Sequence, residues 1–435
     1  MYTTLVPARG ISPLKLYLFP PKLCLLAVVA STFIPASPAQ AQSSSQSTPV
    51  GPAGLVQEDY KAEFEKVWQT VVESFWDRRL NGVDWRGIKA EYRTKLSEVK
   101  SKTEFTRLIN AMLEQLHASH ASYMSDDEYE FYMLPAVVAR DMDGHRIDHI
   151  GITGTVTQDG YRIQAVIDNG PAQKAGIHSG DVILSADGGA FTSAGSFRGK
   201  SGQVVKLRVK RVTSDVIDSV EVTPVNQNIL RAFLESTAGS ARVIEYNKRH
   251  FGYVHLWTMA NDNFKATLDH IVLDQLHETD GLILDLRDGF GGSPMGYADV
   301  FTRPDVIWTT QYRQGPAHSS YTGYGHPMVV LINSGTRSAK EFFSYQLKSS
   351  HRATLIGKPT AGAFLGAGSF PISTTGLLEL PIVGLRVDGQ PLEGRGVQPD
   401  IYVESGESYT ERDPQMLKAE ATLFDQISRQ VASHK

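Results

Sequence analysis

The sequence has almost no cysteine, almost no net charge and no hydrophobic run long enough for a stable membrane span. Cys24 is the only cysteine among 435 residues, and the formal net charge is −4. This balance argues against nucleic-acid binding, because proteins that bind nucleic acid carry a basic surface. With 41% hydrophobic and 21% charged residues, the composition is that of a globular protein and excludes collagen, coiled coil and general disorder. The length predicts two or three domains.

The N-terminal segment is typical of a secretory signal peptide. Arg9, Lys15 and Lys22 precede an apolar run over residues 23–30, and the small residues of Ala39-Gln40-Ala41 follow it. Basic residues, a short apolar run and an A-x-A tripeptide are the three parts of such a signal, and the run is too short for a permanent membrane helix. We therefore expect cleavage after Ala41, with an uncleaved amphipathic anchor as the alternative.

The expected export bears on chemistry and on location. Because Cys24 lies within the signal, the remaining chain has no cysteine, so covalent catalysis would need Ser, Thr or Lys. The expected compartment is a bacterial periplasm, with secretion into the medium as the alternative. No stable membrane insertion is expected after cleavage.

Changes in residue pattern along the chain predict an α/β protein of several domains. The predicted segments are a signal at 1–41, a flexible leader at 42–54, a helical cap domain at 55–138, a small β-rich domain at 139–226, an α/β core at 227–405 and a C-terminal helix at 406–435. In the cap, apolar side chains recur at helical spacing three times between Tyr60 and Leu116, and Ser101 with Glu104 forms a capping-box pattern at the third helix. The aromatic residues of these helices are interpreted as core packing.

The β-rich domain carries a specific motif. Residues 170–183 read G-P-A-x-x-A-G-I-x-x-G-D-x-I, which resembles the signature of a PDZ domain. The resemblance implies that the C-terminus of a peptide adds as a strand, with its carboxylate on backbone N–H groups of a glycine-bearing loop. Ile150, Gly151, Ile152 and Thr153 match that loop best. A module that serves only as a lid or spacer is the alternative.

The α/β core predicts where a site would lie. Residues 281–286 and 328–332 are continuous apolar strands, and the second precedes a helix at 338–349 and a strand at 353–356. Ligands of such sheets bind at the carboxyl ends of the strands. The loops after Leu286 and Ile332 are therefore the candidate site.

Each of these two loops contains residues suited to acyl transfer. Ser338 stands at the first turn of the predicted helix, where free N–H groups favour negative charge, although an N-cap role is the more common reason for a serine there. The loop at 287–294 is rich in glycine and can direct backbone N–H groups at a carbonyl. It lacks the Lys-Ser/Thr ending of a phosphate-binding loop.

The order of motifs adds a family resemblance. D-L-R-x-x-x-G-G at 285–292, N-x-x-T-x-S-A-x-E at 333–341 and G-x-P-T-A-G at 357–362 together resemble the C-terminal-processing (tail-specific) serine peptidases. The resemblance implies a crotonase-like α/β catalytic core with Ser338 as the nucleophile. It also implies an oxyanion hole formed by the N–H of Ala339 and that of Gly291 or Gly292.

The general base departs from the common pattern of that family. The lysine of its Ser-Lys branch would fall 25 residues after the serine, and Ala363 stands there. Lys340 and Lys358 are nearby alternatives, but neither has the matching position. The P-T-A-G-A sequence at 359–363 instead resembles the tricorn protease core, whose base is a histidine.

That second resemblance implies a tetrad. His120 falls on the histidine, Ser119 on the serine before it and Glu393 on a glutamate from the C-terminal part of the core. In this arrangement Ser119 relays a hydrogen bond from Glu393, so that the carboxylate stabilises the imidazolium. A neutral base of this kind is what a serine hydroxyl needs to become nucleophilic. His117 is the competing histidine.

The sequence thus predicts an exported serine endopeptidase whose protein or peptide substrates carry flexible C-termini. A binding protein of the same fold without catalysis and a hydrolase of small esters or peptides are the alternatives. No cofactor or metal is predicted, because the 13 histidines show no metal-ligand spacing. The oligomeric state is left open.

Overall fold

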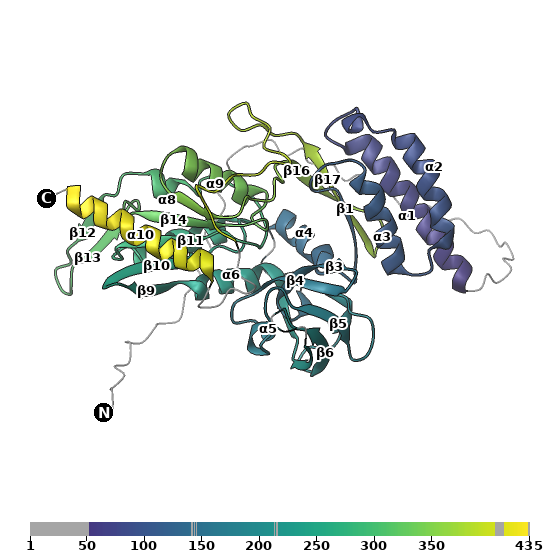
Figure 1. Cartoon of the computed structure of the whole chain (residues 1–435), viewed down its shortest axis with the longest axis horizontal. Helices are drawn as coiled ribbons and strands as arrows, with labels where there is room; N and C mark the ends of the chain where they lie inside the picture. The colour runs from purple at the N-terminus through teal and green to yellow at the C-terminus, as the bar shows by residue number, and fades with distance from the viewer. Residues whose placement is uncertain are drawn as a thin grey trace. The chain divides into compact units, whose positions relative to one another are not determined.

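The computed structural model describes residues 52–140, 142, 144, 146–212, 214, 216–404 and 413–433, all within one packed unit, Val50–Lys435 (Figure 1). The predicted signal, its cleavage site at Ala41 and most of the predicted leader lie outside the described residues, as do residues 405–412. Over the described ranges, no helix combines the length and apolarity that a membrane crossing requires.

Three helices form the N-terminal part, with short 3₁₀ turns, Leu80–Gly82 and Leu96–Glu98, between them. They are α1 (Pro52–Ser74), α2 (Trp85–Lys95) and α3 (Lys102–Glu114). The Ser101 side chain accepts a hydrogen bond from the N–H of Glu104, as its N-cap position predicts. The helix α1 begins at Pro52, so the last three residues of the predicted leader are helical. Apolar side chains from all three helices form one core, which includes Phe64, Ile109 and Leu113.

The β-rich domain is a five-stranded antiparallel sheet. Its strand order is β3-β4-β5-β6-β7, with β3 at an edge, and the strands are β3 (Ile152–Thr157), β4 (Gly160–Val166), β5 (Val182–Ala186), β6 (Val205–Lys210) and β7 (Ile217–Val222). Two short helices, α5 (Pro171–Lys174) and the 3₁₀ turn Gly195–Phe197, complete it. The chain enters through β2 (Arg146–His149) and leaves through β8 (Val225–Asn228), which pair with each other. The domain is therefore an insertion whose two ends meet where β2 pairs with β8.

The α/β core contains a six-stranded sheet in the order β18-β15-β14-β11-β10-β9. All of its pairings are parallel except that of β9 with β10. The strands are β9 (Arg242–Tyr246), β10 (Arg249–His255), β11 (Gly281–Asp285), β14 (Met328–Ile332), β15 (Thr354–Gly357) and β18 (Ile401–Tyr402). The predicted buried strands at 281–286 and 328–332 are confirmed as the two central strands, so the loops that follow them are neighbours.

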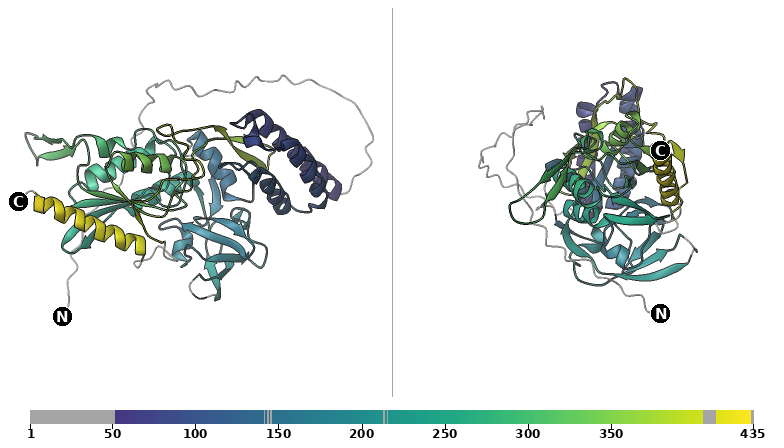
Figure 2. Two further views of the ribbon diagram at one scale, coloured as in Figure 1. Left: turned by 45° about the horizontal axis from the view of Figure 1, so that its top comes forward. Right: turned by 90° about the vertical axis from the view of Figure 1, so that its left-hand side faces the viewer.

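Helices cover both faces of this sheet. One face packs against α6 (Ile229–Ser240), α7 (Asp262–His270) with its π-helical extension Ile271–Gln275, and α9 (Ala339–Ser349). The other face packs against α10 (Pro414–Ser433), whose Ala419 and Leu423 belong to the same apolar cluster as Ile283 and Val329 (Figures 1 and 2). The remaining elements are α4 (Tyr129–Ala139), α8 (Asp299–Thr302) and the hairpin β12 (Ile307–Thr310) with β13 (His318–Tyr321).

A long ribbon joins the core to the N-terminal helices. The strands β16 (Gly366–Pro371) and β17 (Gly376–Val383) leave the core, and β17 pairs antiparallel with β1 (Ser122–Ser125) (Figure 1). Leu378 and Leu380 of this ribbon are buried in the core of the N-terminal helices. Because β1 begins two residues after His120, this pairing determines where residues 119 and 120 lie.

A buried ion network ties the sheet to the last helix. Arg287 donates hydrogen bonds to Asp285, at the end of β11, and to Asp413, directly before α10, and all three side chains are at most 4% exposed. Burial alone would raise the pKa of Asp285, but the charge of Arg287 and the nearby His255 hold it well below its usual value.

We expect Arg287→Met to destabilise the fold by about 3–5 kcal/mol, because it leaves two buried carboxylates without a cation. Urea unfolding followed by circular dichroism measures this loss. Arg249→Met is the matched control, since Arg249 pairs with Asp280 in a partly exposed bridge and its loss should cost about 1 kcal/mol or less. Equal losses in the two variants would contradict the importance of the buried network.

Candidate active site

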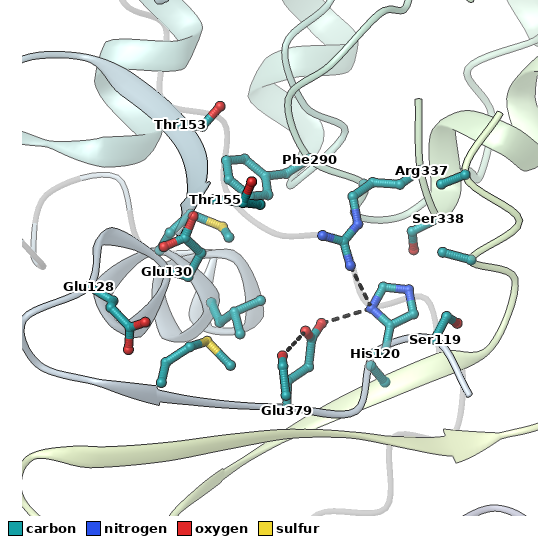
Figure 3. A pocket seen from close by; sticks show the side chains of 18 of the residues that line it. Ser119, His120, Glu128, Glu130, Thr153, Thr155, Phe290, Arg337, Ser338 and Glu379 are labelled. Carbon is teal, nitrogen blue, oxygen red and sulfur yellow. Dashed lines mark hydrogen bonds and ion pairs between the residues drawn. The ribbon is translucent and has the colours of Figure 1, made fainter. Parts of the chain in front are cut away.

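The loops after β11 and β14 open onto a cavity of about 2080 Å³. Its walls come from α3 and β1, from α4, from the β-rich domain with its edge strand β3, and from the core loops with β16 and β17. Ser119, His120, Gly291, Gly292 and Ser338 all line it. The predicted site residues from distant parts of the sequence are thus brought to one cavity, and Figure 3 shows several of them together.

Ser338 precedes α9 in an unusual backbone conformation. Its φ is 55° and its ψ is −126°, in a region that residues with a side chain rarely occupy. Such a conformation costs roughly 1–3 kcal/mol and persists only where the surroundings enforce it. Glu341 contributes to that enforcement, because its carboxylate accepts from the N–H of Ser338 at 2.9 Å. The sharp turn presents the Ser338 side chain to the cavity.

The glycine loop lies directly against this serine. A Cβ atom placed on Gly291 would be 2.6 Å from the Cβ of Ser338 and 3.0 Å from the nitrogen of Ala339, so only glycine fits there. The loop is held by the N–H of Met259 and the hydroxyl of Thr258, which both donate to the Gly291 carbonyl. Among the described residues, nothing accepts a hydrogen bond from the N–H of Gly291 or of Ala339. Two adjacent N–H groups therefore remain for a ligand oxygen.

His120 is oriented by a carboxylate that the sequence analysis did not single out. Its Nδ1 lies 2.8 Å from Oε1 of Glu379 on β17, while Arg337 approaches the same nitrogen at 3.4 Å. Burial would raise the pKa of Glu379, but the hydrogen bond with His120 and the charge of Arg337 hold it below its usual value. An ionised Glu379 accepts the Nδ1 proton, which leaves the lone pair of His120 on Nε2.

The second ring nitrogen of His120 is an unpaired group of the site. Nε2 is buried and has no hydrogen-bond partner among the described residues. In Figure 3 this side of the imidazole faces the hydroxyl of Ser338. His120 itself has a φ of 57°, so both residues of this pair occupy strained backbone positions.

Ser119 and Glu393 meet as the tetrad resemblance implies, but they do not contact the imidazole in the implied way. Glu393 accepts from the N–H and the hydroxyl of Ser119, at 2.8 and 3.1 Å, and from the N–H groups of Phe364 and Leu365. The Nδ1–H of His120 donates to Glu379 and does not contact Ser119, and the guanidinium of Arg337 lies 3.4 Å from the same nitrogen. Glu393 thus fastens the segment before β1 to the core.

Three sequence families match consecutive parts of the chain. Residues 56–114 match the tricorn protease C1 domain, residues 149–223 a PDZ domain and residues 250–403 peptidase family S41. The α/β core contains a serine peptidase domain of family S41. The expected serine peptidase and PDZ assignments are thereby confirmed.

Individual relatives, which match most of the chain, agree with this assignment. The carboxyl-terminal-processing protease of Picosynechococcus sp. is 26% identical over 318 residues, which are 68% of this chain and 72% of that protein. The protein of the same name from Synechocystis sp. is 25% identical over 349 residues, 78% of this chain and 79% of its own length. A solved tricorn protease aligns with 86% of this chain and 37% of its own at a TM-score of 0.52 and 18% identity, which shows a shared fold.

The two lysines considered as bases in the S41 domain are engaged elsewhere. Lys358 pairs with Glu404 at the surface, with its nitrogen 2.8 Å from the carboxylate. Lys340 is fully buried, and its Nζ donates to the carbonyl oxygens of Asp288, at 2.6 Å, and Arg287, at 3.4 Å. Neither residue lines the cavity, and neither does His117, which is exposed. Lys340 instead fastens the start of the glycine loop to α9.

Burial lowers the pKa of Lys340 to about 7, although Asp285 and Asp288 oppose the shift. In the unfolded chain Lys340 keeps its proton up to about pH 10. Between about pH 7 and pH 10 the unfolded state therefore binds one more proton than the folded state, so folding stability rises with pH. We expect the unfolding free energy of the wild type, relative to Lys340→Met, to increase by about 1 kcal/mol per pH unit between pH 7 and 9. Urea titrations of both proteins at several pH values measure this. Parallel profiles would contradict the buried, titrating lysine.

Glu130 is a titratable group of the cavity wall. It projects from α4 into the cavity, on the side opposite Arg337 (Figure 3). Burial raises its pKa to about 7, and the nearby Glu128 and Glu379 act in the same direction while Arg337 opposes them. The charge of this wall therefore changes close to neutral pH.

The predicted peptide-binding loop contributes only in part. Of Ile150, Gly151, Ile152 and Thr153, only Thr153 lines the cavity. Ile150 and Ile152 are buried in the core of the PDZ domain, and the N–H of Gly151 donates to His149. The cavity wall is made instead by the rest of the edge strand β3 and the turn after it, residues 153–158.

Two carboxylates near the serine were missed as site residues. Glu379 stands alone within the apolar stretch Leu377–Leu380, and a single acid in a buried strand is a signal that could have found it. Glu341 is part of the S-A-x-E motif but received no role. Its carboxylate accepts from the hydroxyl of Thr360 and from the N–H groups of Ser338, Gly362 and Ala363, so it connects the serine turn to the P-T-A-G-A loop.

Proposed function

We propose that this chain is an exported serine endopeptidase that cleaves peptide bonds near flexible C-termini through an acyl-enzyme. Ser338 attacks the peptide carbonyl while His120 takes its proton, and the N–H groups of Gly291 and Ala339 bind the oxygen that becomes negative. His120 then gives the proton to the leaving amine. A water molecule, deprotonated by His120, releases the acyl group from Ser338 in the second half of the reaction.

The observation that carries this proposal is the pairing of the strained Ser338 with the buried, unpartnered Nε2 of His120. A buried nitrogen without a partner is costly, and one that faces a serine hydroxyl is placed to accept its proton. Its lone pair is free because Glu379 holds the proton on the other nitrogen. This is the arrangement that a serine needs in order to lose its proton during attack.

The two carboxylates have different proposed roles. Glu379 orients the imidazole and stabilises its positive charge directly, as the aspartate of a catalytic triad does. Glu393 and Ser119 hold the segment that carries His120 in place. All four residues of the tetrad implied by the tricorn resemblance thus keep a role in this proposal, and Glu379 is added as the partner of the imidazole.

The form of the cavity favours a polypeptide substrate over a small ester. Its volume of about 2080 Å³ exceeds the roughly 300–1,000 Å³ of sites for small ligands. Exposed apolar side chains from separate elements line it, namely Val138, Val156, Met295 and Leu385. The edge strand β3 forms one wall, so a peptide added to this edge enters the cavity that contains Ser338. Relatives named as carboxyl-terminal-processing proteases agree with this choice of substrate.

The domain boundaries and the location belong to the same proposal. Residues 55–138 act as a helical cap, residues 139–226 as a PDZ domain that presents substrate, and residues 227–405 as a crotonase-like core followed by a C-terminal helix. The signal at 1–41 directs the protein to the periplasm. Mass spectrometry of the protein recovered from periplasmic extract, with an N-terminus at Gln42, tests the last point.

The test of the function is covalent labelling with a fluorophosphonate, which bonds to an activated serine as fluoride leaves. We expect the label on Ser338 in the wild type and its loss in His120→Ala. His117→Ala is the matched control, because this exposed histidine lies three residues earlier and does not line the cavity. Its labelling should equal that of the wild type.

The outcomes separate the alternatives. Labelling of Ser338 together with cleavage of a peptide that has a free, flexible C-terminus supports the proposal. Labelling with turnover of short esters but of no peptide would make the chain a small-ester hydrolase. No labelling, or labelling that survives the loss of His120, would overturn the catalytic assignment in favour of a binding protein.

A further inference from the structure

Two histidines and an aspartate that are far apart in the sequence meet at the end of the core sheet remote from Ser338. One ligand atom from each of His277, Asp305 and His326 lies within 4.8 Å of the other two. Nε2 of His277 is 3.1 Å from both carboxylate oxygens of Asp305. His277 is buried, Asp305 reaches the surface and His326 is intermediate. The three atoms are close enough to share one ion.

The topology separates this cluster from the active site. His277 comes shortly before β11 and His326 two residues before β14, so both lie at the amino ends of the two central strands. The glycine loop and Ser338 follow the carboxyl ends of the same strands. Each strand has five residues and spans about 16 Å. An ion at the cluster would therefore be too distant to take part in the attack on a substrate.

Neighbouring side chains hold the cluster in shape. The ring of Tyr321 stacks on His277 at 3.4 Å between centroids, and its hydroxyl donates to Glu278. Arg352 donates to the carbonyls of Tyr324 and His326, which fixes the turn before β14. The guanidinium is thus occupied with carbonyl oxygens, and Glu278 adds a negative charge near the cluster through its bond with Tyr321. A site whose ligands are already in place binds an ion without a large cost of ordering.

We propose that His277, Asp305 and His326 bind a divalent transition-metal ion of the Zn²⁺ class, with water completing the coordination. Two imidazoles and a carboxylate are ligands that Zn²⁺ takes in proteins, whereas Mg²⁺ and Ca²⁺ prefer oxygen alone. No spacing motif marks these ligands in the sequence, because they come from three separate loops, 28 and 21 residues apart.

The ion would fasten the β12–β13 hairpin to the core. Asp305 stands two residues before β12, and Tyr321 ends β13, so the cluster lies at the base of this hairpin. All four residues of β12 are exposed, including Ile307 and Trp308, and the hairpin extends away from the sheet in Figures 1 and 2. Because few side chains of the hairpin are buried, contacts at its base must hold it in a fixed position.

The test uses the untagged protein, stripped with EDTA and equilibrated by dialysis with ZnCl₂, followed by measurement of bound metal. We expect one Zn²⁺ per chain in the wild type. His326→Gln and Asp305→Asn should each weaken binding by about 100-fold or more, which exceeds the roughly 10–100-fold cost of losing a partner outside the coordination shell. His270→Gln is the matched control, since His270 also pairs with an aspartate, Asp274, but lies outside the cluster.

Two further measurements keep the result decisive. Bound Co²⁺ should give the visible absorption of a low-coordinate nitrogen–oxygen site in the wild type and in His270→Gln, and not in Asp305→Asn. Near-ultraviolet circular dichroism confirms that each variant is folded, and Asp305→Asn changes only one atom of a surface side chain. Absence of bound metal from the wild type at about 100 μM free Zn²⁺ would overturn the proposal. Equal binding by Asp305→Asn and the wild type would do so as well.

Discussion

Replacing Ser338 by alanine should reduce kcat for peptide hydrolysis by about 10⁴-fold or more, because it removes the hydroxyl that we propose as the nucleophile. The fold should be retained, since alanine keeps the Cβ atom that packs against Gly291. The measurement is steady-state cleavage of a peptide with a free C-terminus, with thermal unfolding in parallel. Ser349→Ala, an exposed serine at the far end of the same helix, is the control and should keep full activity.

The backbone at Ser338 gives a second readout. Ser338→Gly should be as inactive as Ser338→Ala but more stable than the wild type by about 1 kcal/mol, because glycine occupies a positive φ without strain. Strain that is held for function and released by an inactivating change is typical of catalytic residues. Activity that survives in both variants would remove Ser338 from the mechanism.

The central part of the fold could be predicted from the sequence because its signals are local. The apolar strands at 281–286 and 328–332 are buried on both faces, and the helix and strand that follow them appear where the pattern places them. The same pattern places Ser338 and the glycine loop at the carboxyl ends of neighbouring strands. Their contact through Gly291 follows directly from this topology.

The orientation of His120 could not be predicted in the same way, because it depends on a pairing between strands far apart in the sequence. Ser122 stands opposite Glu379 in the β1–β17 pair, and this register brings the carboxylate beside the imidazole. No periodicity within either strand indicates the partner of the other. The family resemblance identified His120, Ser119 and Glu393, with Glu393 as the carboxylate that supports the histidine. In the structure Glu393 accepts hydrogen bonds from Ser119 and from the N–H groups of Phe364 and Leu365.

The two carboxylates can be separated by amide substitution. Glu379→Gln should lower kcat by about 10³–10⁴-fold with little change in KM, because an amide can no longer fix the tautomer or stabilise the imidazolium. Glu393→Gln should cost only about 10–100-fold, since this group acts through the position of the segment that carries Ser119 and His120. Peptide hydrolysis measured for both variants over a range of substrate concentrations gives the two effects.

The control for this pair is Glu404→Gln, which removes a carboxylate from a surface bridge with Lys358 and should leave kcat unchanged. A similar loss in Glu379→Gln and Glu393→Gln would mean that the Ser119 relay operates during turnover and that the two carboxylates act on one imidazole. A larger loss in Glu393→Gln would return the main role to the tetrad implied by the tricorn resemblance. We predict the larger loss in kcat for Glu379→Gln, because this carboxylate contacts Nδ1 directly and interacts most strongly with the positive charge that develops on the ring.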